Sequence, residues 1–312
     1  MSLDLAIVIL NYNTRDLLRR CLQTVYASAG DFAFAVCVVD NASGDGSAAM
    51  VAAEFPQAIL IASSTNGGYS YGNNLGFRRF GFSDAPGASG AENVAETPRF
   101  ALLLNPDTEV PADALAGMLA FMDARPQCGV AGPKLVRLDG SLDLACRRSF
   151  PSPEVSAYRM LGLSKLFPQS PRFGRYNMTY LSPDVLTEVD SVVGAFMLVR
   201  GAAIQQVGLL DETFFMYGED LDWAFRIKQA GWQVWYNPAV TVLHVKEAAS
   251  KTSSKARREF YRAMLLFYRK HYEATTPRWL HWLIVGGIGV RGALAVAGRS
   301  LSQLRARVLP GA

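Results

Sequence analysis

Four short apolar segments in the first 110 residues alternate with stretches of helical spacing, and this alternation constrains the fold more than any other feature. Such a pattern is typical of βαβ units around a mainly parallel sheet. The helix after the first segment is the clearest, because Thr14 is placed as its N-cap and apolar residues follow at helical spacing. We therefore expect an α/β protein. The four expected strands are 5–10, 35–40, 58–63 and 101–104.

Polar residues follow each strand at its carboxyl end, the edge of an open α/β sheet at which ligands bind. Asparagine and aspartate also make good turns, so a single ending of this kind has no functional meaning. Four in succession favour a ligand site at which the strand ends converge. The endings are Asn11-Tyr12-Asn13, Asp40-Asn41, the Gly- and Asn-rich stretch 65–77, and Asn105-Pro106-Asp107.

Several classes of protein are excluded by what the sequence lacks. A Rossmann dehydrogenase has a GxGxxG turn after its first strand, but "NYNTRD" stands there, and no Walker A motif occurs. The formal net charge of +4 is too small for wrapping nucleic acid by bulk charge, so we expect no nucleic-acid partner. The four cysteines have no CxxC spacing, which favours reduced, buried thiols over a disulfide framework or a zinc site.

Asp107 ends an apolar strand, where an unpaired carboxylate would be costly to desolvate. We interpret it as a ligand of a divalent cation, Mg²⁺ or Mn²⁺, because hard cations prefer carboxylate and phosphate oxygens together. The cation would bridge Asp107 to a diphosphate and neutralise charge as that group departs. The alternative is that Asp107 only caps a turn. Asp40, one strand away, could accept hydrogen bonds from a ribose or a base edge.

A second acidic group, Glu219, Asp220 and Asp222, opens an expected helix. Carboxylates in a first turn are stabilised by the helix dipole and the free N–H groups, so plain capping is the alternative interpretation. Asp222 and Arg226 are spaced i, i+4 and predict a structural pair. Asp220 has aromatic residues on both sides in the sequence, and a carboxylate in such a setting can act as a general base toward a hydroxyl. We assign this role to Asp220.

His244 ends the β-like run 240–245. A lone histidine at a strand end is more often structural, but here it could complete the coordination of a cation that Asp107 alone would hold weakly. The Ser-, Thr- and Lys-rich stretch 246–255 suits a mobile lid that closes on a diphosphate. The Ala- and Gly-rich stretch 83–98 predicts a flexible surface excursion without chemistry.

The pattern is less regular after residue 129. Residues 130–149 predict a hairpin that turns at Asp139-Gly140. A further strand is expected at 191–200, whereas residues 151–184 give no secure assignment.

Over roughly residues 3–272, the motifs resemble those of family 2 of the inverting glycosyltransferases, in order and at the expected spacing. The branch most similar to this chain is that of the rhamnosyltransferases that build bacterial surface polysaccharides. The resemblance implies a GT-A fold, in which a Rossmann-like, mainly parallel sheet binds the nucleotide sugar and is joined to an acceptor-binding half. The motifs are "VILNYNTRDLLRRCLQTV", "VVDNASGDGS", "NGGYSYGNNLGF", "LLLNPDTEV" and "GLLDETFFMYGEDLDWAFRIKQAGW".

The resemblance also implies roles for individual residues. Asp107 would be the one acid of a DxD-type metal site whose first acid is replaced by Asn105, and His244 would be an auxiliary metal or diphosphate contact. Asp220 would be the base of a single displacement with inversion. The acceptor would contact Glu219, Trp223 and Arg226. The donor would contact Asn11, Tyr12, Asn13, Asp40, Asn66, Gly68, Asn73, Asn74 and Asn105.

The expected organisation is one GT-A domain at residues 1–272 and a helical tail at 273–312. Within the domain, the nucleotide-sugar half covers about 1–128 and the acceptor half about 129–272.

The tail raises the question of a membrane. Twenty residues from Trp279 span roughly 30 Å as a helix, enough to cross a bilayer. Arg291 and several glycines weaken that interpretation, and tryptophans beside basic residues favour an amphipathic helix in the interface. Packing on the domain is the third alternative. Because the chain begins without a basic n-region, we expect a cytoplasmic protein, peripheral on the inner face of the membrane through residues 277–312.

The expected activity is transfer of a sugar from a nucleotide-diphosphate donor to a saccharide or a polyprenyl-diphosphate-linked saccharide. L-Rhamnose from dTDP-rhamnose is preferred on the resemblance alone. One alternative is a sugar-1-phosphate nucleotidyltransferase, which would need a Gly-rich turn with Arg and Lys after the first strand. Another is a non-catalytic nucleotide-sugar-binding subunit, which should lack Asp107 or Asp220.

Overall fold

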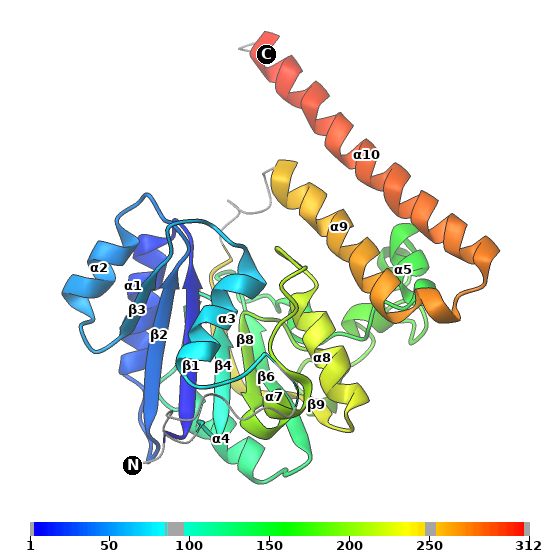
Figure 1. Cartoon of the computed structure of the whole chain (residues 1–312). Coiled ribbons are helices and arrows are strands. Elements are labelled where there is room, and N and C mark those ends of the chain that lie inside the picture. Colours follow the sequence, from blue (N-terminus) through cyan, green and yellow to red (C-terminus); the bar gives the residue numbers. More distant parts are fainter. Residues whose placement is uncertain (1–2, 85, 87–96, 247–253, 309–312) are drawn as a thin grey trace.

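A nine-stranded sheet forms the centre of the protein in a computed structural model that describes residues 3–84, 86, 97–246 and 254–308. The strand order is β3-β2-β1-β4-β8-β6-β9-β5, with β7 paired to β9 beside this path. Helices cover the sheet on both sides, and the chain ends in two long helices that extend away from it (Figure 1). The strands are β1 (Leu5–Asn11), β2 (Phe34–Asp40), β3 (Ile59–Ala62), β4 (Phe100–Leu104), β5 (Thr108–Glu109), β6 (Cys128–Val136), β7 (Thr187–Glu188), β8 (Phe196–Arg200) and β9 (Gln233–His244). The helices are α1 (Arg15–Tyr26), α2 (Ser47–Glu54), α3 (Tyr69–Arg79), α4 (Ala114–Asp123), α5 (Pro153–Met160), α6 (Leu163–Leu166), α7 (Gly201–Val207), α8 (Glu219–Gln229), α9 (Ser254–His271) and α10 (Arg278–Val308).

The four strands expected in the first half are present and run parallel to one another. Their carboxyl ends therefore lie along one edge of the sheet, as the α/β prediction requires. The second half of the sheet is mixed, because β8 is antiparallel to both β4 and β6, while β9 is parallel to β6. The chain is thus an α/β protein with a mainly parallel sheet.

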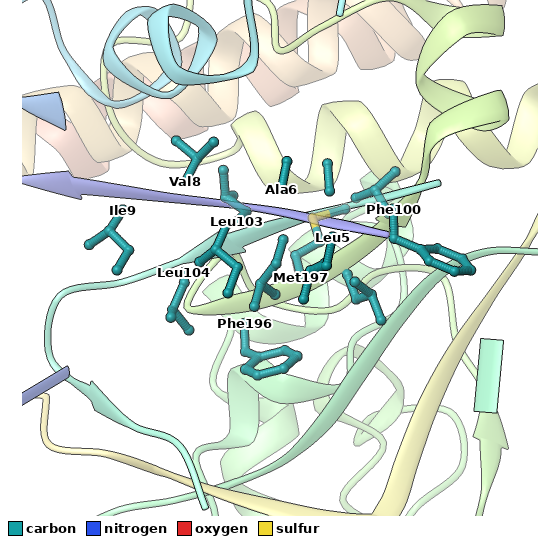
Figure 2. Packing of buried hydrophobic residues seen from close by; sticks show 14 of the residues in the cluster. Leu5, Ala6, Val8, Ile9, Phe100, Leu103, Leu104, Phe196 and Met197 are labelled. Atoms are coloured by element: carbon teal, nitrogen blue, oxygen red, sulfur yellow. The ribbon is translucent and has the colours of Figure 1, made fainter. Parts of the chain in front are cut away.

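The core lies on both faces of the central strands. Every residue of β1 is buried, because helices cover the sheet on both sides, and this explains the unbroken apolar run of its sequence. Leu5 lies opposite Phe100 in the register of β1 with β4, and Leu104 lies opposite Phe196 in that of β4 with β8. Figure 2 shows side chains of these three strands packing together. The four cysteines are free, buried thiols, as expected.

The hairpin expected at 130–149 is wrong in its second arm. Strand β6 ends at Val136, and the chain turns through Gly140, whose N–H donates to Arg137 O at 2.9 Å. Only an isolated bridge between Val136 and Leu142 follows, and a 3₁₀ turn comes next. The region 151–184, which the sequence left unassigned, contains α5 and α6. The surface excursion expected at 83–98 lies largely outside the described residues, which omit 85 and 87–96.

Most of the described part of the tail forms α10, which lies along α9 and continues past the point where α9 begins (Figure 1). It is tied to the rest of the protein by two guanidinium groups: Arg257 donates to Ala295 O at 2.8 Å, and Arg291 donates to Met160 O at 2.7 Å. Within the part of the chain described, no helix combines the length and the apolarity needed to cross a membrane. The tail therefore packs on α9 and α5.

Candidate functional site

One cavity of about 730 Å³ lies where β4, α8 and β9 approach one another. Asp107 reaches it from the turn after β4, Asp220 from the first turn of α8, and His244 from the end of β9. Two acids separated by more than a hundred positions in the sequence thus share one cleft, together with Asn105 and Glu219. The cavity volume is in the range of ligand-binding clefts.

The ends of β1 and β2 are joined by a buried hydrogen-bond network. Asn11 Nδ2 donates to Asp40 Oδ1 at 2.9 Å and to Ser43 Oγ at 3.1 Å, and the Ser43 N–H donates to Asp40 Oδ2 at 3.0 Å. Each oxygen of the Asp40 carboxylate thus accepts one hydrogen bond from the described residues. Asn13 holds the neighbouring loop through Gly44, whose N–H donates to Asn13 Oδ1 at 2.8 Å. Tyr12 is 51% exposed at the same edge of the sheet.

The Gly- and Asn-rich stretch after β3 packs against the segment before α8. Asn66 Oδ1 accepts hydrogen bonds from Asn41 Nδ2 at 3.0 Å and from the Gly68 N–H at 3.1 Å. Gly68 has φ +93°, and a Cβ at this position would lie 2.6 Å from Phe215 O, so the close approach requires glycine. The segment that leads into α8, the helix with Asp220, therefore packs directly on this turn.

Asn73 and Asn74, which the resemblance assigns to the donor, are not among the residues that line the cavity. Both are buried on the inner face of α3. Asn74 Nδ2 donates to Leu210 O and to Glu212 Oε1 at 2.9 Å each, while its Oδ1 accepts from the Leu210 N–H at 3.1 Å. Asn73 Nδ2 donates to Tyr69 O at 2.8 Å. These amides hold α3 in place, and Asn74 fastens it to the loop before α8.

His244 lies between two carboxylates. Its Nε2 is 3.3 Å from Asp107 Oδ1, and its Nδ1 is 2.9 Å from Asp143 Oδ2. Lys246 Nζ donates to both oxygens of Asp143 at 2.9 Å. Burial opposes a charge on the imidazole, but the two carboxylates outweigh it and raise the pKa of His244. Burial likewise opposes a charge on Asp143, but His244 and Lys246 outweigh it and hold its pKa well below the usual range.

These residues fit a cation that is shared with a ligand rather than one held by protein alone. Among the described residues, no group of three or more His, Cys, Asp or Glu side chains could hold a metal ion. Asp107 and His244 present one oxygen and one ring nitrogen to the same cavity. A carboxylate on Nδ1, here Asp143, is the usual partner that frees Nε2 of a histidine for a metal. Mg²⁺ binds in this way through one or two carboxylates plus substrate phosphates, so the set fits such an ion.

Asp220 is held by a buried guanidinium. Its Oδ2 accepts from Arg148 Nη2 at 2.7 Å and from the Gly194 N–H at 3.0 Å, and its Oδ1 accepts from the Leu221 N–H at 2.7 Å. Arg148 Nη2 also donates to Val192 O at 2.6 Å. The carboxylate is therefore oriented by two separate segments of the chain, one with Arg148 in the expected hairpin and one with Gly194 in the strand expected at 191–200. Neither Arg148 nor Asp143 was among the predicted site residues.

Glu219, next to Asp220, lies in a different environment. It is buried, lines the same cavity, and its Oε2 has no hydrogen-bond partner among the residues described. Burial, together with the charge of Asp220, raises the pKa of Glu219 to about 8. A carboxyl group of this kind is protonated at neutral pH and can donate a hydrogen bond.

Trp223 and Arg226, which the resemblance assigns to the acceptor, are not among the residues that line the cavity. Trp223 is fully buried in the core, and its Nε1 donates to Gly208 O at 2.9 Å. Arg226 donates to Asp222 Oδ2 at 2.9 Å and to two backbone carbonyls, so it is the structural pair that the i, i+4 spacing predicted. The lid expected at 246–255 lies largely outside the described residues, which omit 247–253.

Comparisons with known proteins show the family of the chain. Residues 4–263 match the model of a family described as Glycosyltransferase like family 2. The chain is 26% identical over 306 residues to the N-acetylglucosaminyl-diphospho-decaprenol L-rhamnosyltransferase of Mycobacterium tuberculosis, covering 98% of this chain and 96% of that protein. It is also 26% identical over 242 residues to the low-salt glycan biosynthesis hexosyltransferase Agl10 of Haloferax volcanii, covering 77% of this chain and 67% of that protein.

Solved structures show the same fold. The mannosyltransferase PcManGT from Pyrobaculum calidifontis, in complex with GDP-Man and Mn²⁺, superposes with a TM-score of 0.55 at 14% identity. That likeness covers 100% of this chain and 77% of PcManGT. Residues 1–349 of TarS from S. aureus give a TM-score of 0.53 at 15% identity, covering 94% of this chain and 72% of that one. The expected GT-A architecture is thereby confirmed.

Proposed function

Because the chain belongs to the glycosyltransferase-like family 2, and is therefore a transferase, we propose that it moves L-rhamnose from dTDP-rhamnose to a lipid-linked saccharide with inversion. The observation that carries the proposal is that Asp107 and Asp220 line one cavity. A cation site on one side and an acceptor base on the other are what a single displacement at an anomeric carbon needs. The transferred sugar and the lipid-linked acceptor are proposed from the name of the rhamnosyltransferase relative.

Asp220 is the proposed general base. Its Oδ2 is occupied by Arg148 and the Gly194 N–H, whereas Oδ1 accepts only the Leu221 N–H among the described groups. Oδ1 therefore has capacity for the acceptor hydroxyl and takes its proton as the oxygen attacks the anomeric carbon. The carbon–oxygen bond to the diphosphate breaks on the opposite face of the sugar, so the configuration inverts.

The leaving diphosphate is proposed to bind at Asp107 and His244. A divalent cation, Mg²⁺ or Mn²⁺, would supply charge neutralisation for this group when bound. Asp143 positions the His244 ring through Nδ1, and Lys246 keeps Asp143 ionised. Mn²⁺ in the PcManGT complex supports a cation in this fold.

The nucleoside is proposed to lie over the ends of β1, β2 and β3. Tyr12 offers an exposed ring, and Asp40 retains unused acceptor capacity beside it. The remaining donor contacts are assigned to Asn11, Asn13, Asn66, Gly68 and Asn105. On this proposal, residues of about 1–128 bind the donor and those of about 129–272 bind the acceptor.

Transfer assays with a panel of nucleotide sugars test the proposal. We expect release of dTDP from dTDP-rhamnose only when a saccharide-diphosphate-prenyl acceptor and Mg²⁺ or Mn²⁺ are both present. The product linkage, read by NMR, should have the configuration opposite to that of the donor. Asp107→Ala should remove the cation dependence together with the activity. Transfer from GDP-mannose but not from dTDP-rhamnose would overturn the donor assignment, and a retained configuration would overturn the mechanism.

We also propose that the tail rests on the cytoplasmic face of a membrane. Trp279 and Trp282, near the start of α10, are 67% and 66% exposed, and aromatic rings of this kind settle at the bilayer interface. Replacing both by serine should reduce flotation with anionic vesicles without changing the melting temperature, because neither ring is buried. Unchanged flotation would show that the tail does not anchor the protein.

A further inference from the structure

A second, smaller cavity opens from the site cavity toward the tail. It has a volume of about 250 Å³, and its wall is shared with the site cavity at several residues of α8 and α9 and the segments before them. The shared residues are Tyr176, Tyr217, Gly218, Leu221, Phe260 and Tyr261. The small cavity therefore adjoins the cavity in which the acceptor hydroxyl would meet Asp220.

A third cavity, of about 840 Å³, continues the path between α5, α9 and α10. It shares a wall with the small cavity at Pro151, Ser156, Met160, Met264 and Phe267. Its outer part is lined by aliphatic side chains of α10, and Glu154 alone carries a charge among the described residues that line it. The path along α10 from Arg291 to Leu280 covers about 17 Å at 1.5 Å per residue.

Cations lie where this path leaves the site. Arg257 lines the site cavity, while Arg159 and Arg291 line the small one. None of the three has a carboxylate partner in the part of the chain that the structure describes. Arg159 instead lies over the ring of Tyr176, with its Cζ 3.9 Å from the centroid. A charged group between an apolar groove and the catalytic cavity would thus meet unneutralised guanidinium groups, which suit phosphate.

We propose that the groove formed by α5, α9 and α10 binds the prenyl chain of the acceptor and that Arg159 and Arg291 bind its diphosphate. This inference rests on the proposed function, since it assigns a place to the lipid part of that acceptor. The order along the path matches the order of groups in such a molecule: sugar at Asp220, diphosphate at the arginines, chain in the apolar groove. The groove ends beside the exposed tryptophans of α10, where the rest of a long chain enters the membrane.

Leu283 and Val290 provide a matched pair of positions for a test. Leu283 lines the groove and is 65% exposed, whereas Val290 is 62% exposed on the same helix and lines none of the three cavities. Glutamate at either position places an exposed charge on α10, so neither variant should lower the melting temperature. Only Leu283→Glu puts that charge beside the prenyl chain.

The assay uses the full-length protein in detergent, with two acceptors that carry the same saccharide diphosphate on a geranyl chain or on a long polyprenyl chain. We expect Leu283→Glu to raise KM for the long-chain acceptor about tenfold, since each methylene that loses apolar contact costs roughly a factor of four. The kcat and the KM for the geranyl acceptor should stay within twofold of the wild type. Val290→Glu should change neither. Equal KM changes for both acceptors, or none, would overturn the groove assignment.

A separate variant tests the assignment of the arginines to the diphosphate. Arg159→Gln should raise KM for both diphosphate acceptors alike and leave KM for the nucleotide sugar unchanged; an unchanged KM for the acceptors would overturn it. If Leu283→Glu acts only on acceptor embedded in phosphatidylglycerol vesicles and not in detergent, the residue contacts the membrane and the groove assignment fails. Failure of the proposed function itself would appear differently, as absence of transfer by the wild type to any of these acceptors.

Discussion

Replacing Asp220 by asparagine separates the chemical role of this carboxylate from its structural role. Asparagine keeps the size of the side chain but cannot take a proton, so we expect kcat to fall by about 10²- to 10⁴-fold, the usual contribution of a general base. Nucleotide-sugar binding should persist, because the residues proposed to contact the donor lie outside α8, the helix that contains Asp220. Both quantities are measurable, by single-turnover transfer and by calorimetric titration with dTDP.

The same substitution also leaves a buried positive charge without its partner. The Arg148 and Asp220 side chains are 8% and 7% exposed, and their nearest atoms are 2.7 Å apart. Removing one member of a buried pair costs about 3–5 kcal/mol. The entropy of unfolding for 312 residues makes 3 kcal/mol equivalent to roughly 5 °C in the melting temperature. Activity must therefore be compared at a temperature at which both proteins are folded.

Two further variants distinguish the two roles. Arg148→Met combined with Asp220→Asn removes the unpaired charge, so stability should partly return while transfer does not. Asp222→Asn, on the same helix turn, breaks the pair with Arg226 at 2.9 Å and the contacts of Asp222 with Lys270 and His271 at 2.8 Å each. Asp222 does not line the cavity, so this variant should lower stability and leave kcat within a few-fold. A double variant that is folded and retains more than a tenth of the wild-type kcat would refute Asp220 as the base.

Three other substitutions have defined outcomes. Because burial raises the pKa of Glu219 to about 8, the folded state holds a proton that the unfolded state releases above about pH 4.5, so stability falls as pH rises between these values. Melting curves from pH 5 to 8.5 should show this slope and lose part of it in Glu219→Gln; an identical slope would exclude Glu219 as the group. Asp143→Asn should weaken Mn²⁺ affinity in the presence of dTDP by about 10- to 100-fold, measured by titration, because it releases the His244 ring; unchanged affinity would exclude His244 as a ligand. Asn74→Ala should lower the free energy of unfolding in urea by about 1–3 kcal/mol, since it leaves the Leu210 backbone groups unpaired. The affinity for dTDP should stay the same. Loss of dTDP affinity in the folded variant would show that Asn74 acts in donor binding.

Local patterns determined which parts of the fold were predictable. A strand buried on both faces leaves an unbroken apolar run, as in β1, and a helix on the surface of a sheet leaves a periodic one, as in α1 and α8. Both signals depend only on neighbours in the sequence. The strand expected at 191–200 is present as β8, but its place in the sheet has no local signal, because β8 inserts between β4 and β6 from far along the chain.

The candidate site was predictable only in part for the same reason. Asp107 and Asp220 each follow a recognisable local motif, and the structure brings them to one cavity. The residues that position the site do not follow such motifs. Asp143 contacts His244 from 101 positions away in the sequence, and Arg148 contacts Asp220 from 72 positions away. Trp223 is a different case, since its place on the apolar face of α8 already favoured burial in the core over contact with an acceptor.

The two adjacent carboxyl groups at the start of α8 also explain why Asp220 rather than Glu219 is assigned as the base. A base must be ionised and aimed at the acceptor before reaction, and geometry comes before pKa in this choice. Arg148 and the Gly194 N–H fix the plane of the Asp220 carboxylate, whereas Glu219 Oε2 has no partner among the described residues. The raised pKa of Glu219 keeps it neutral at pH 7, so it cannot take a proton there but can donate a hydrogen bond into the same cavity. Environments that differ in this way let one turn of helix supply a proton acceptor and a hydrogen-bond donor side by side, which is why the segment containing Arg148 matters to the chemistry as much as the acidic motif itself.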